Sequence, residues 1–219
     1  MIDFYSKFIQ PNDLCFDVGA NIGERTELFY KLGAKVITFE PQNSCFVILQ
    51  NKFSENKSIT LLPFALGRVE KQDELLICDE TNECSTLSQN FVSVYSNYSN
   101  LHWQKKEKIQ VTTLDKVIEK YGLPKFIKLD VEGYESEVLA GLNLKVKYIA
   151  FEFNRPLISD TILCLEKLKE IGNCRCNFIK YEFMELALKD WMPIKEFTKN
   201  LTKLIGEDVL TGEIFIEFA

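Results

Sequence analysis

The sequence predicts an α/β domain built on a mostly parallel sheet. Short apolar runs alternate with helical periodicity along most of the 219 residues, and this alternation is typical of parallel strands joined by crossover helices. The first apolar run, Leu14 to Val18, leads directly into the glycine turn Gly19-Ala20-Asn21-Ile22-Gly23, which indicates a strand followed by a helix. At roughly 150 residues per domain, the length leaves room for one domain with an insertion.

The first half of the chain predicts three βα units. After the glycine turn, Leu28, Phe29 and Leu32 can share one face of a helix, and Gly33 suits the left-handed position that ends a helix. The elements expected next are a strand over 35–39 that ends before Glu40-Pro41, a helix over 44–53, a strand over 59–64 and a terminal turn at Ala65-Leu66-Gly67.

The second half continues the alternation. A helical stripe runs from Leu114 to Tyr121 and stops at Gly122. Ser159 is expected to cap a later helix that carries Leu165 and Leu168. The other elements expected are a strand over 126–130, a short helix around Val138 and Leu139, a strand over 146–153, and an antiparallel pair formed by 177–181 and 213–218.

An insertion is expected over about 68–110, within a single domain that spans 1–219. Residues 75–78 and 109–112 could pair as a small antiparallel ribbon. The segment 85–103 is rich in Ser, Asn, Tyr and Phe without helical spacing, and a long loop inside a compact domain is usually functional or disordered. Its aromatic content favours a lid or a substrate wall.

Composition limits the partners and the compartment. The net charge is -6 and no Lys/Arg block is long enough to neutralise a run of phosphates, so nucleic acid is not an expected partner. No apolar stretch approaches the roughly 20 residues of a membrane span, and residues 1–10 do not resemble a secretory signal. The seven cysteines form an odd, scattered set, which favours reduced thiols and a cytoplasmic location.

The strongest chemical signal is the D-x-G-x-x-x-G spacing of Asp17, Gly19 and Gly23. Ligands of such sheets bind beyond the carboxyl ends of the strands, and glycines there let a ligand approach the backbone. An acidic residue at this place would repel the pyrophosphate of a dinucleotide, whereas a cationic ligand such as S-adenosylmethionine fits. The alternative is that the two glycines form only a tight turn.

Glu40 strengthens the ligand interpretation because it ends the second strand. An acidic side chain at that place can accept hydrogen bonds from both ribose hydroxyls of an adenosyl ligand. The alternative is a solvated charge at a strand end.

A third signal, Lys128-Leu129-Asp130-Val131-Glu132-Gly133-Tyr134-Glu135, places three carboxylates at the end of the fourth strand. At this point the chain resembles the FkbM-like methyltransferases, a branch of the class I S-adenosylmethionine-dependent enzymes. The resemblance covers about residues 10–155 and rests on D-V-G-A-N-I-G at 17–23, F-E-P at 39–41, A-L-G at 65–67, T-L-D at 113–115 and K-L-D-V-E-G-Y-E at 128–135.

The resemblance implies a Rossmann-like, doubly wound, mostly parallel seven-stranded sheet with an antiparallel last strand. It also implies S-adenosylmethionine as cofactor and methyl transfer to a hydroxyl on a sugar, glycan or small metabolite. Asp17 and the glycines would surround the methionine part, Glu40 the ribose and Ala65 with Leu66 the adenine. The implied cofactor-binding residues are Asp17, Gly19, Asn21, Gly23, Glu40, Pro41, Ala65, Leu66 and Asp130.

A hydroxyl acceptor requires a group that takes its proton. The catalytic candidates are Asp130, Glu132, Glu152 and His102. Asp130 or Glu132 is favoured, because clustering and partial burial raise the pKa of a carboxyl group toward neutrality. Glu132 could instead stabilise a helix N-terminus, and His102 is either incidental or a base carried by a mobile loop.

Three further hypotheses remain open. Asp130 and Glu132 have the oxygen ligands of a divalent cation, but without a third clear ligand no metal is predicted. A catalytically silent S-adenosylmethionine-binding module would keep the same motifs. A nucleotide-dependent Rossmann enzyme would use a similar sheet, although Asp17 and the glycine spacing argue against it.

Overall fold

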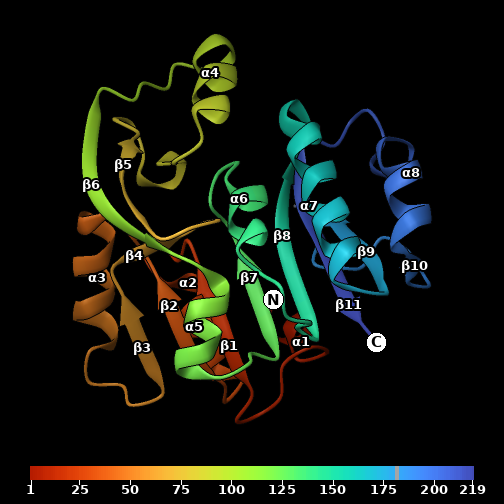
Figure 1. Ribbon diagram of the computed structural model, residues 1–219, viewed down its shortest axis with the longest axis horizontal. Helices are drawn as coiled ribbons and strands as arrows, with labels where there is room; N and C mark the ends of the chain where they lie inside the picture. The colour runs from red at the N-terminus through yellow and green to blue at the C-terminus, as the bar shows by residue number, and fades with distance from the viewer. Residues whose placement is uncertain (181–182) are drawn as a thin grey trace.

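A central sheet of eight strands organises the molecule, and a second sheet of three strands lies beside it (Figure 1). The computed structural model describes residues 1–180 and 183–219. The strand order in the central sheet is β10-β9-β11-β8-β7-β1-β2-β3. The strands are β1 (Leu14–Val18), β2 (Lys35–Phe39), β3 (Ile59–Leu62), β7 (Phe126–Leu129), β8 (Tyr148–Asn154), β9 (Cys174–Lys180), β10 (Met192–Pro193) and β11 (Thr211–Phe218).

The predicted α/β fold with a mostly parallel sheet is confirmed. Strands β3, β2, β1, β7 and β8 are parallel neighbours. The last strand, β11, is antiparallel to both β8 and β9 and lies between them. The sheet has one strand more than the seven expected, because the two-residue strand β10 pairs with β9 at the edge.

Apolar side chains cover both faces of the central sheet. One core includes strand residues such as Phe151 with side chains of α5 to α8, and the other packs α1, α2 and α3 against residues such as Phe126 and Phe215. The helices of the central unit are α1 (Ile2–Tyr5), α2 (Glu24–Lys31), α3 (Asn43–Phe53), α5 (Leu114–Tyr121), α6 (Glu135–Ala140), the 3-10 turn η2 (Arg155–Leu157), α7 (Ile158–Ile171) and α8 (Ile194–Ile205).

The register of the parallel strands aligns their carboxyl ends. Val18 pairs with Phe39 on one side and with Leu129 on the other, and Leu129 pairs with Phe151. The residues that follow these four therefore emerge at one edge of the sheet. This alignment brings the Gly19 turn, Glu40, Asp130 and Glu152 together, as the expected position of ligands in an open α/β sheet requires.

The insertion forms the second sheet, in the order β4-β6-β5, with a helix at its far end (Figure 1). Two predictions in this region are wrong. Ala65 and Leu66 belong to a strand that pairs in parallel with β6 instead of forming a turn, and part of the predicted loop 85–103 is helical. The elements are β4 (Phe64–Leu66), β5 (Lys71–Ile77), the 3-10 turn η1 (Asn82–Cys84), α4 (Gln89–Tyr98) and β6 (Lys105–Thr112).

Smaller differences concern the C-terminal third. Ser159 lies inside the first turn of α7, whose N-cap is Leu157. The predicted strand 177–181 begins earlier, at Cys174, and its expected last residue, Tyr181, lies outside the described residues. Among the described residues, no helix combines the length and the apolar character needed to cross a bilayer.

Candidate functional site

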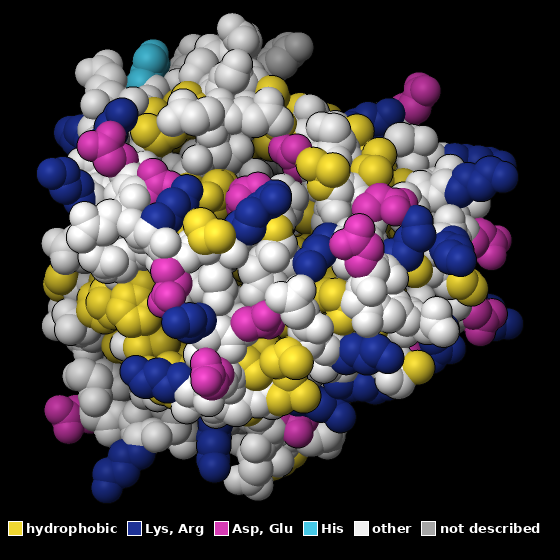
Figure 2. Space-filling view, in the orientation of Figure 1, with side chains coloured by type: hydrophobic (Ala, Val, Ile, Leu, Met, Phe, Trp, Pro, Cys, Tyr) yellow, Lys and Arg dark blue, Asp and Glu magenta, His cyan; other side chains and the backbone are white. Residues whose placement is uncertain are grey.

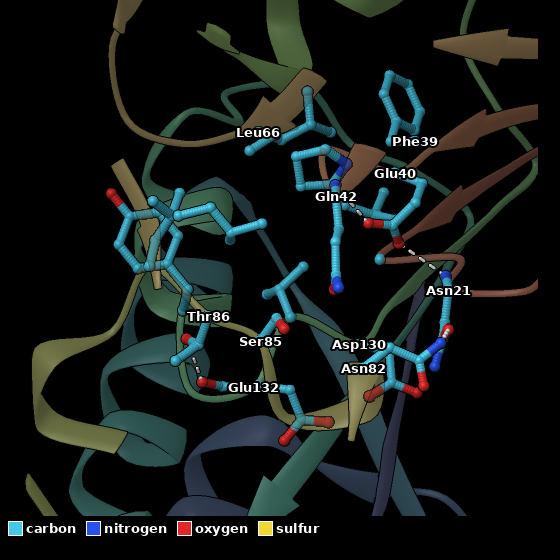
Figure 3. A pocket seen from close by; sticks show the side chains of 18 of the residues that line it. Asn21, Phe39, Glu40, Gln42, Leu66, Asn82, Ser85, Thr86, Asp130 and Glu132 are labelled. Atoms are coloured by element: carbon cyan, nitrogen blue, oxygen red, sulfur yellow. Dashed lines mark hydrogen bonds between the residues drawn. The ribbon is translucent and has the colours of Figure 1, made fainter. Parts of the chain in front are cut away.

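Two adjoining cavities open at the carboxyl ends of the parallel strands. The first lies between β2, the β4 end of the second sheet and the segment 82–87 (Figure 3), and the second lies between the glycine turn, β7 and β8. The second has a volume of about 330 Å³, which is within the range of small-molecule sites. The cavities share the lining residues Gly19, Asn21, Glu83, Asp130 and Glu132.

The glycine turn has a backbone that only specific residues tolerate. Gly19 has a φ of +79°, and a Cβ there would overlap the backbone carbonyl oxygen of Asp130. Gly23 has a φ of +89° and is the N-cap of α2; a Cβ there would lie 2.6 Å from the side chain of Leu49. The two glycines therefore let the turn pass close to β7 and to α3.

Glu40 is held in place by the protein's own backbone. Its buried carboxylate accepts hydrogen bonds from the backbone N–H groups of Asn21 (2.7 Å) and Gln42 (2.8 Å), and it lines the first cavity (Figure 3). Burial raises its pKa to about 7, although the two N–H donors act in the opposite sense. A carboxylate held in this way can accept hydrogen bonds from a diol without reorganising.

Asp17 is the second-last residue of β1, just before Val18, and it lines the second cavity. The Thr26 hydroxyl donates a hydrogen bond of 2.5 Å to its carboxylate, and the hydroxyls of Thr26 and Thr38 are 3.1 Å apart. Burial raises the pKa of Asp17 to about 6. The residue is thus a fixed acidic group at the base of the cavity.

Three carboxylates meet at the ends of β7 and β8. Asp130, Glu132 and Glu152 each place one oxygen within 4.8 Å of the others. Burial, followed by the charge of Asp130, raises the pKa of Glu132 and of Glu152 well above the ordinary range. Asp130 differs from the other two because the buried ammonium of Lys128 lies 3.2 Å from it.

Glu132 owes its place to an unusual backbone. It has a φ of +52° and is followed by Gly133 at +81°. Its carbonyl oxygen accepts a hydrogen bond of 2.8 Å from the Thr86 hydroxyl, which ties this turn to the insertion. Glu132 precedes the N-cap of α6, Tyr134, by two residues, whereas Glu135 lies in the first turn of α6 and its carboxylate accepts a hydrogen bond from the Val131 N–H (2.9 Å).

Most of the predicted site residues converge on the two cavities. His102 does not: its side chain is 60% exposed, and its Nδ1 lies 2.7 Å from the Glu80 carboxylate, outside both cavities. Gly23 lies outside them as well and shapes the turn instead. The predicted residues that line one or both cavities are Asp17, Gly19, Asn21, Glu40, Pro41, Ala65, Leu66, Asp130, Glu132 and Glu152.

Sequence reasoning misses one wall of the site. The Asn82 amide donates hydrogen bonds to the Asn21 side chain (2.8 Å) and to the Cys45 thiol (3.2 Å), so the insertion is fastened to the glycine turn. The polar run T-N-E-C-S-T at 81–86 is the available signal, whereas the predicted wall is 85–103. Ser85, Thr86 and Leu87 line the first cavity at the start of that predicted wall, and the lining residues missed include Gln42, Leu75, Asn82, Glu83 and Tyr134 in the first cavity and Glu24 and Arg25 in the second.

The residues that line the two cavities fit a positively charged ligand that carries an adenosyl group. Apolar side chains such as Phe39, Leu66 and Leu87 line the first cavity beside Glu40, and carboxylates line the second. The three clustered carboxylates could also share one divalent cation, but acidic clusters are common without an ion. No metal was predicted from the sequence because no third ligand was identified there; Glu152 supplies a third carboxylate, and we assign no metal to the cluster.

Comparisons with known proteins agree with this architecture. The chain matches the methyltransferase FkbM domain over residues 17–191. No curated protein matches the sequence. Three solved structures share the fold at low sequence identity, and each is similar over nearly all of this chain.

The first is a precorrin-6y C5,15-methyltransferase from Geobacter metallireducens, with 9% identity, a TM-score of 0.50 and coverage of 99% of this chain and 87% of that one. The second is a TehB-like S-adenosylmethionine-dependent methyltransferase from Corynebacterium glutamicum, with 10% identity, a TM-score of 0.50 and coverage of 100% and 86%. The third is a fibrillarin from Aeropyrum pernix, solved with natively bound S-adenosyl-L-methionine, with 7% identity, a TM-score of 0.51 and coverage of 95% and 68%.

These similarities show the fold, and the domain match covers most of the chain, including the glycine turn, Glu40 and the three carboxylates. The chain therefore belongs to the FkbM methyltransferase family of S-adenosylmethionine-dependent enzymes.

Proposed function

We propose that the protein transfers a methyl group from S-adenosylmethionine to a hydroxyl oxygen of a sugar, glycan or other small metabolite. The observation that carries this proposal is the arrangement of acidic groups along two joined cavities. Glu40 is fixed at one end, and the Asp130, Glu132 and Glu152 cluster lies at the other. A cationic donor with a diol in its middle matches that order of groups.

Each part of the donor has a matching part of the site. Glu40 would accept hydrogen bonds from the ribose hydroxyls, while Phe39 and Leu66 would contact the adenine. The methionine part would lie over Gly19 with its ammonium toward Asp17. Asp130 lines both cavities, so its charge would face the sulfonium.

The chain's own task is to align the acceptor and to remove its proton. When bound, S-adenosylmethionine supplies a methyl group whose bond to sulfur breaks as the bond to the acceptor oxygen forms. We propose Glu132 as the group that accepts the hydroxyl proton, with Glu152 beside it. Burial and the charge of Asp130 raise the pKa of both groups, which makes each a stronger base than an ordinary carboxylate, whereas Asp130 is engaged with Lys128.

The charge of the second cavity favours a neutral or cationic acceptor. Arg25 is its one basic lining residue among those described. A phosphate-rich polymer entering this space would face uncompensated carboxylates, and nucleic-acid sites have the opposite charge. A polyhydroxylated acceptor can instead donate hydrogen bonds to the acidic lining residues Asp17, Glu24, Glu83, Asp130, Glu132 and Glu152.

We also propose a reducing compartment, the cytoplasm, for this activity. All seven cysteines are free. Cys45 contributes its thiol to the site through the hydrogen bond from Asn82. Free thiols persist most readily in the reducing environment of the cytoplasm.

Calorimetry with S-adenosylmethionine and with NAD separates the proposed donor from a nucleotide. We expect the first to bind and the second not to bind. Purified protein with the donor is then screened by mass spectrometry for a methyl gain on neutral glycans, hydroxylated metabolites and RNA. Methylated RNA without methylated hydroxyl compounds would contradict the acceptor class, and donor binding without transfer to any of them would favour a silent module.

The role of Glu132 is tested with Glu132→Gln. We expect turnover to fall by about 100-fold or more, with donor affinity changed only a few-fold. Glu74→Gln is the control, because Glu74 lies on β5, pairs with Lys106 at the surface and lines neither cavity. Unchanged turnover of Glu132→Gln would remove Glu132 from the mechanism.

A further inference from the structure

We propose that Lys128 is a positioning residue that holds the Asp130 carboxylate toward the sulfonium of the donor, and that Glu213 competes with Asp130 for the Lys128 ammonium. This inference rests on the proposed function, because it assigns a task to charges that lie beneath the same cavity. Lys128 belongs to β7 and Glu213 to the last strand, β11. Neither side chain is among the residues that the sequence predicts for the site.

Lys128 is an ammonium group enclosed by the protein. The residue has no exposed surface, and lysines are almost never buried in this way without partners. Its Nζ lies 3.0 Å from the Leu129 carbonyl oxygen, 3.2 Å from the Asp130 carboxylate and 3.3 Å from the Glu213 carboxylate. It therefore bridges an acid that lines the cavities and an acid that lies below them.

Glu213 holds the other side of this bridge. It has no exposed surface, and strand pairing sets it beside Glu152 on β8. The Tyr5 hydroxyl donates a hydrogen bond of 3.1 Å to it, and an Arg25 nitrogen lies 3.8 Å away. Arg25 in turn lines the second cavity, so the chain of charges begins and ends at the cavity wall.

Stability alone does not account for this arrangement. Removing charges from water costs several kcal/mol per ion, and well-packed apolar residues often replace buried ion pairs without loss of stability. Phe126 and Phe215, on the two strands that carry Lys128 and Glu213, already form an apolar core on the same side of the sheet. We therefore attribute these buried charges to their electrostatic effect on the Asp130 carboxylate.

Lys128 decides which of the three clustered acids carries the negative charge. Three carboxylates within 4.8 Å repel one another, so one or two of them tend to hold a proton. The ammonium lies 3.2 Å from the Asp130 carboxylate. A proton shared by the cluster is then held between Glu132 and Glu152, whose pKa is raised, and the one of these two that is ionised accepts the acceptor's proton. Asp130 is left to face the donor.

Other charges also face Asp130 and enter any pH dependence. Asp17 lies on β1, Glu132 follows β7, Glu135 begins α6 and Glu152 lies on β8; each of them is electrostatically coupled to Asp130. The test therefore compares variants with the wild type, in which all of these groups are retained.

The experiment measures the dissociation constant of S-adenosylmethionine from about pH 5 to about pH 9 by calorimetry, for the wild type and three variants. Lys128→Met removes the cation. We therefore expect the acidic limb, the pH range below which binding of S-adenosylmethionine weakens, to move up by about one pH unit. Glu213→Gln removes the competing anion and leaves the ammonium to Asp130, so we expect the limb to move down. Glu217→Gln on the same strand, whose carboxylate pairs with Arg175, should leave the limb in place.

The opposite directions separate positioning from a loss of structure. S-adenosylhomocysteine, which lacks the sulfonium charge, checks that each variant is folded and should lose less affinity than S-adenosylmethionine in Lys128→Met. If Lys128→Met does not fold, the downward shift in Glu213→Gln still decides the question. The inference would be overturned if Lys128→Met and Glu213→Gln both showed the pH dependence of the wild type, or if both shifted it in the same direction. A wild type that does not bind S-adenosylmethionine would instead refute the proposed function.

Discussion

At the residue scale, backbone conformation explains why specific residue types occur at the site. Gly19, Asn21 and Glu132 all have a positive φ. For Gly19 the sequence predicted the need for glycine but attributed it to a ligand. The structure adds a second cause, because the Asp130 carbonyl oxygen occupies the place of a Cβ. That cause depends on a residue far along the chain, so it could not be read from the local pattern.

Gly19→Ala should therefore cost more stability than a positive φ alone explains. Gly206 provides the matched control, because it has a φ of +85° and no atom lies within 4 Å of the place that a Cβ would take. We expect Gly206→Ala to lower the free energy of unfolding by about 1–3 kcal/mol, because its φ of +85° and ψ of 174° lie in a region that glycine almost alone adopts, and Gly19→Ala to cost about 2 kcal/mol more through added overlap. Urea unfolding measures both. Equal losses of unfolding free energy in the two variants would show that β7 shifts to accommodate the extra methyl group.

At the element scale, the parallel strands and an antiparallel ribbon in the insertion, formed by β5 and β6, could be predicted, whereas β4 and helix α4 were missed. The apolar runs of β1, β2, β7 and β8 are short and bounded by glycine or acidic residues, so their pattern is clear in the sequence. Helix α4 was missed although Phe91, Val94 and Tyr95 recur at helical spacing, and local contacts support it. The Ser88 side chain caps it and Phe91 stacks on Tyr95 at 4.4 Å.

Helix α8 is a second omission of this kind. Its buried residues Ile194, Phe197, Leu201 and Ile205 recur at helical spacing, so the sequence does carry the signal for this helix.

The position of Asn82, in contrast, is not set by the local sequence. Its contact with the glycine turn exists only because the second sheet folds back over the first cavity, and this return is set by pairing between distant strands.

Asn82→Ala should speed release of the donor, because its amide fastens the segment 82–87 to Asn21 and Cys45. A net hydrogen bond is worth about 0.5–1.5 kcal/mol, so we expect the dissociation rate to rise by about 3-fold to 10-fold. Stopped-flow fluorescence measures that rate. Asn90→Ala is the control, since its amide contacts Asp160 on α7 outside both cavities. Equal rates in both variants would show that the contact does not retain the donor.

At the scale of the whole molecule, the strand order sets the charge distribution. Acidic residues gather at the carboxyl ends of the parallel strands, where both proposed ligand cavities lie. At the opposite edge, a hollow is lined by Lys147, Lys169, Arg175 and Lys195, together with the acidic residue Glu217. On the face shown in Figure 2, basic and acidic side chains are interspersed. The motifs predicted the acidic rim, but the buried Glu213 beneath it depends on β11 inserting between β8 and β9.

This concentration of buried acids predicts how stability depends on pH. Burial raises the pKa of Asp17 to about 6 and that of Glu40 and Glu135 to about 7, whereas in the unfolded chain these groups titrate near pH 4. Between about pH 4 and about pH 7 the folded protein therefore holds more protons than the unfolded chain, so the free energy of unfolding falls as pH rises through this window. Glu27 and Glu80, whose pKa is lowered, act in the opposite sense but lie at the surface.

Thermal unfolding of the ligand-free protein should accordingly show a higher midpoint near pH 5.5 than near pH 7.5. Glu40→Gln should flatten the dependence, because it removes one of the groups that take up a proton on folding. S-adenosylmethionine should raise the midpoint more at the higher pH, since its positive charge favours the ionised acids that burial disfavours. A midpoint that rises steadily across this range in the ligand-free protein would mean that the buried acids stay ionised, and the proton-sharing cluster at Glu132 and Glu152 would then lose its physical basis.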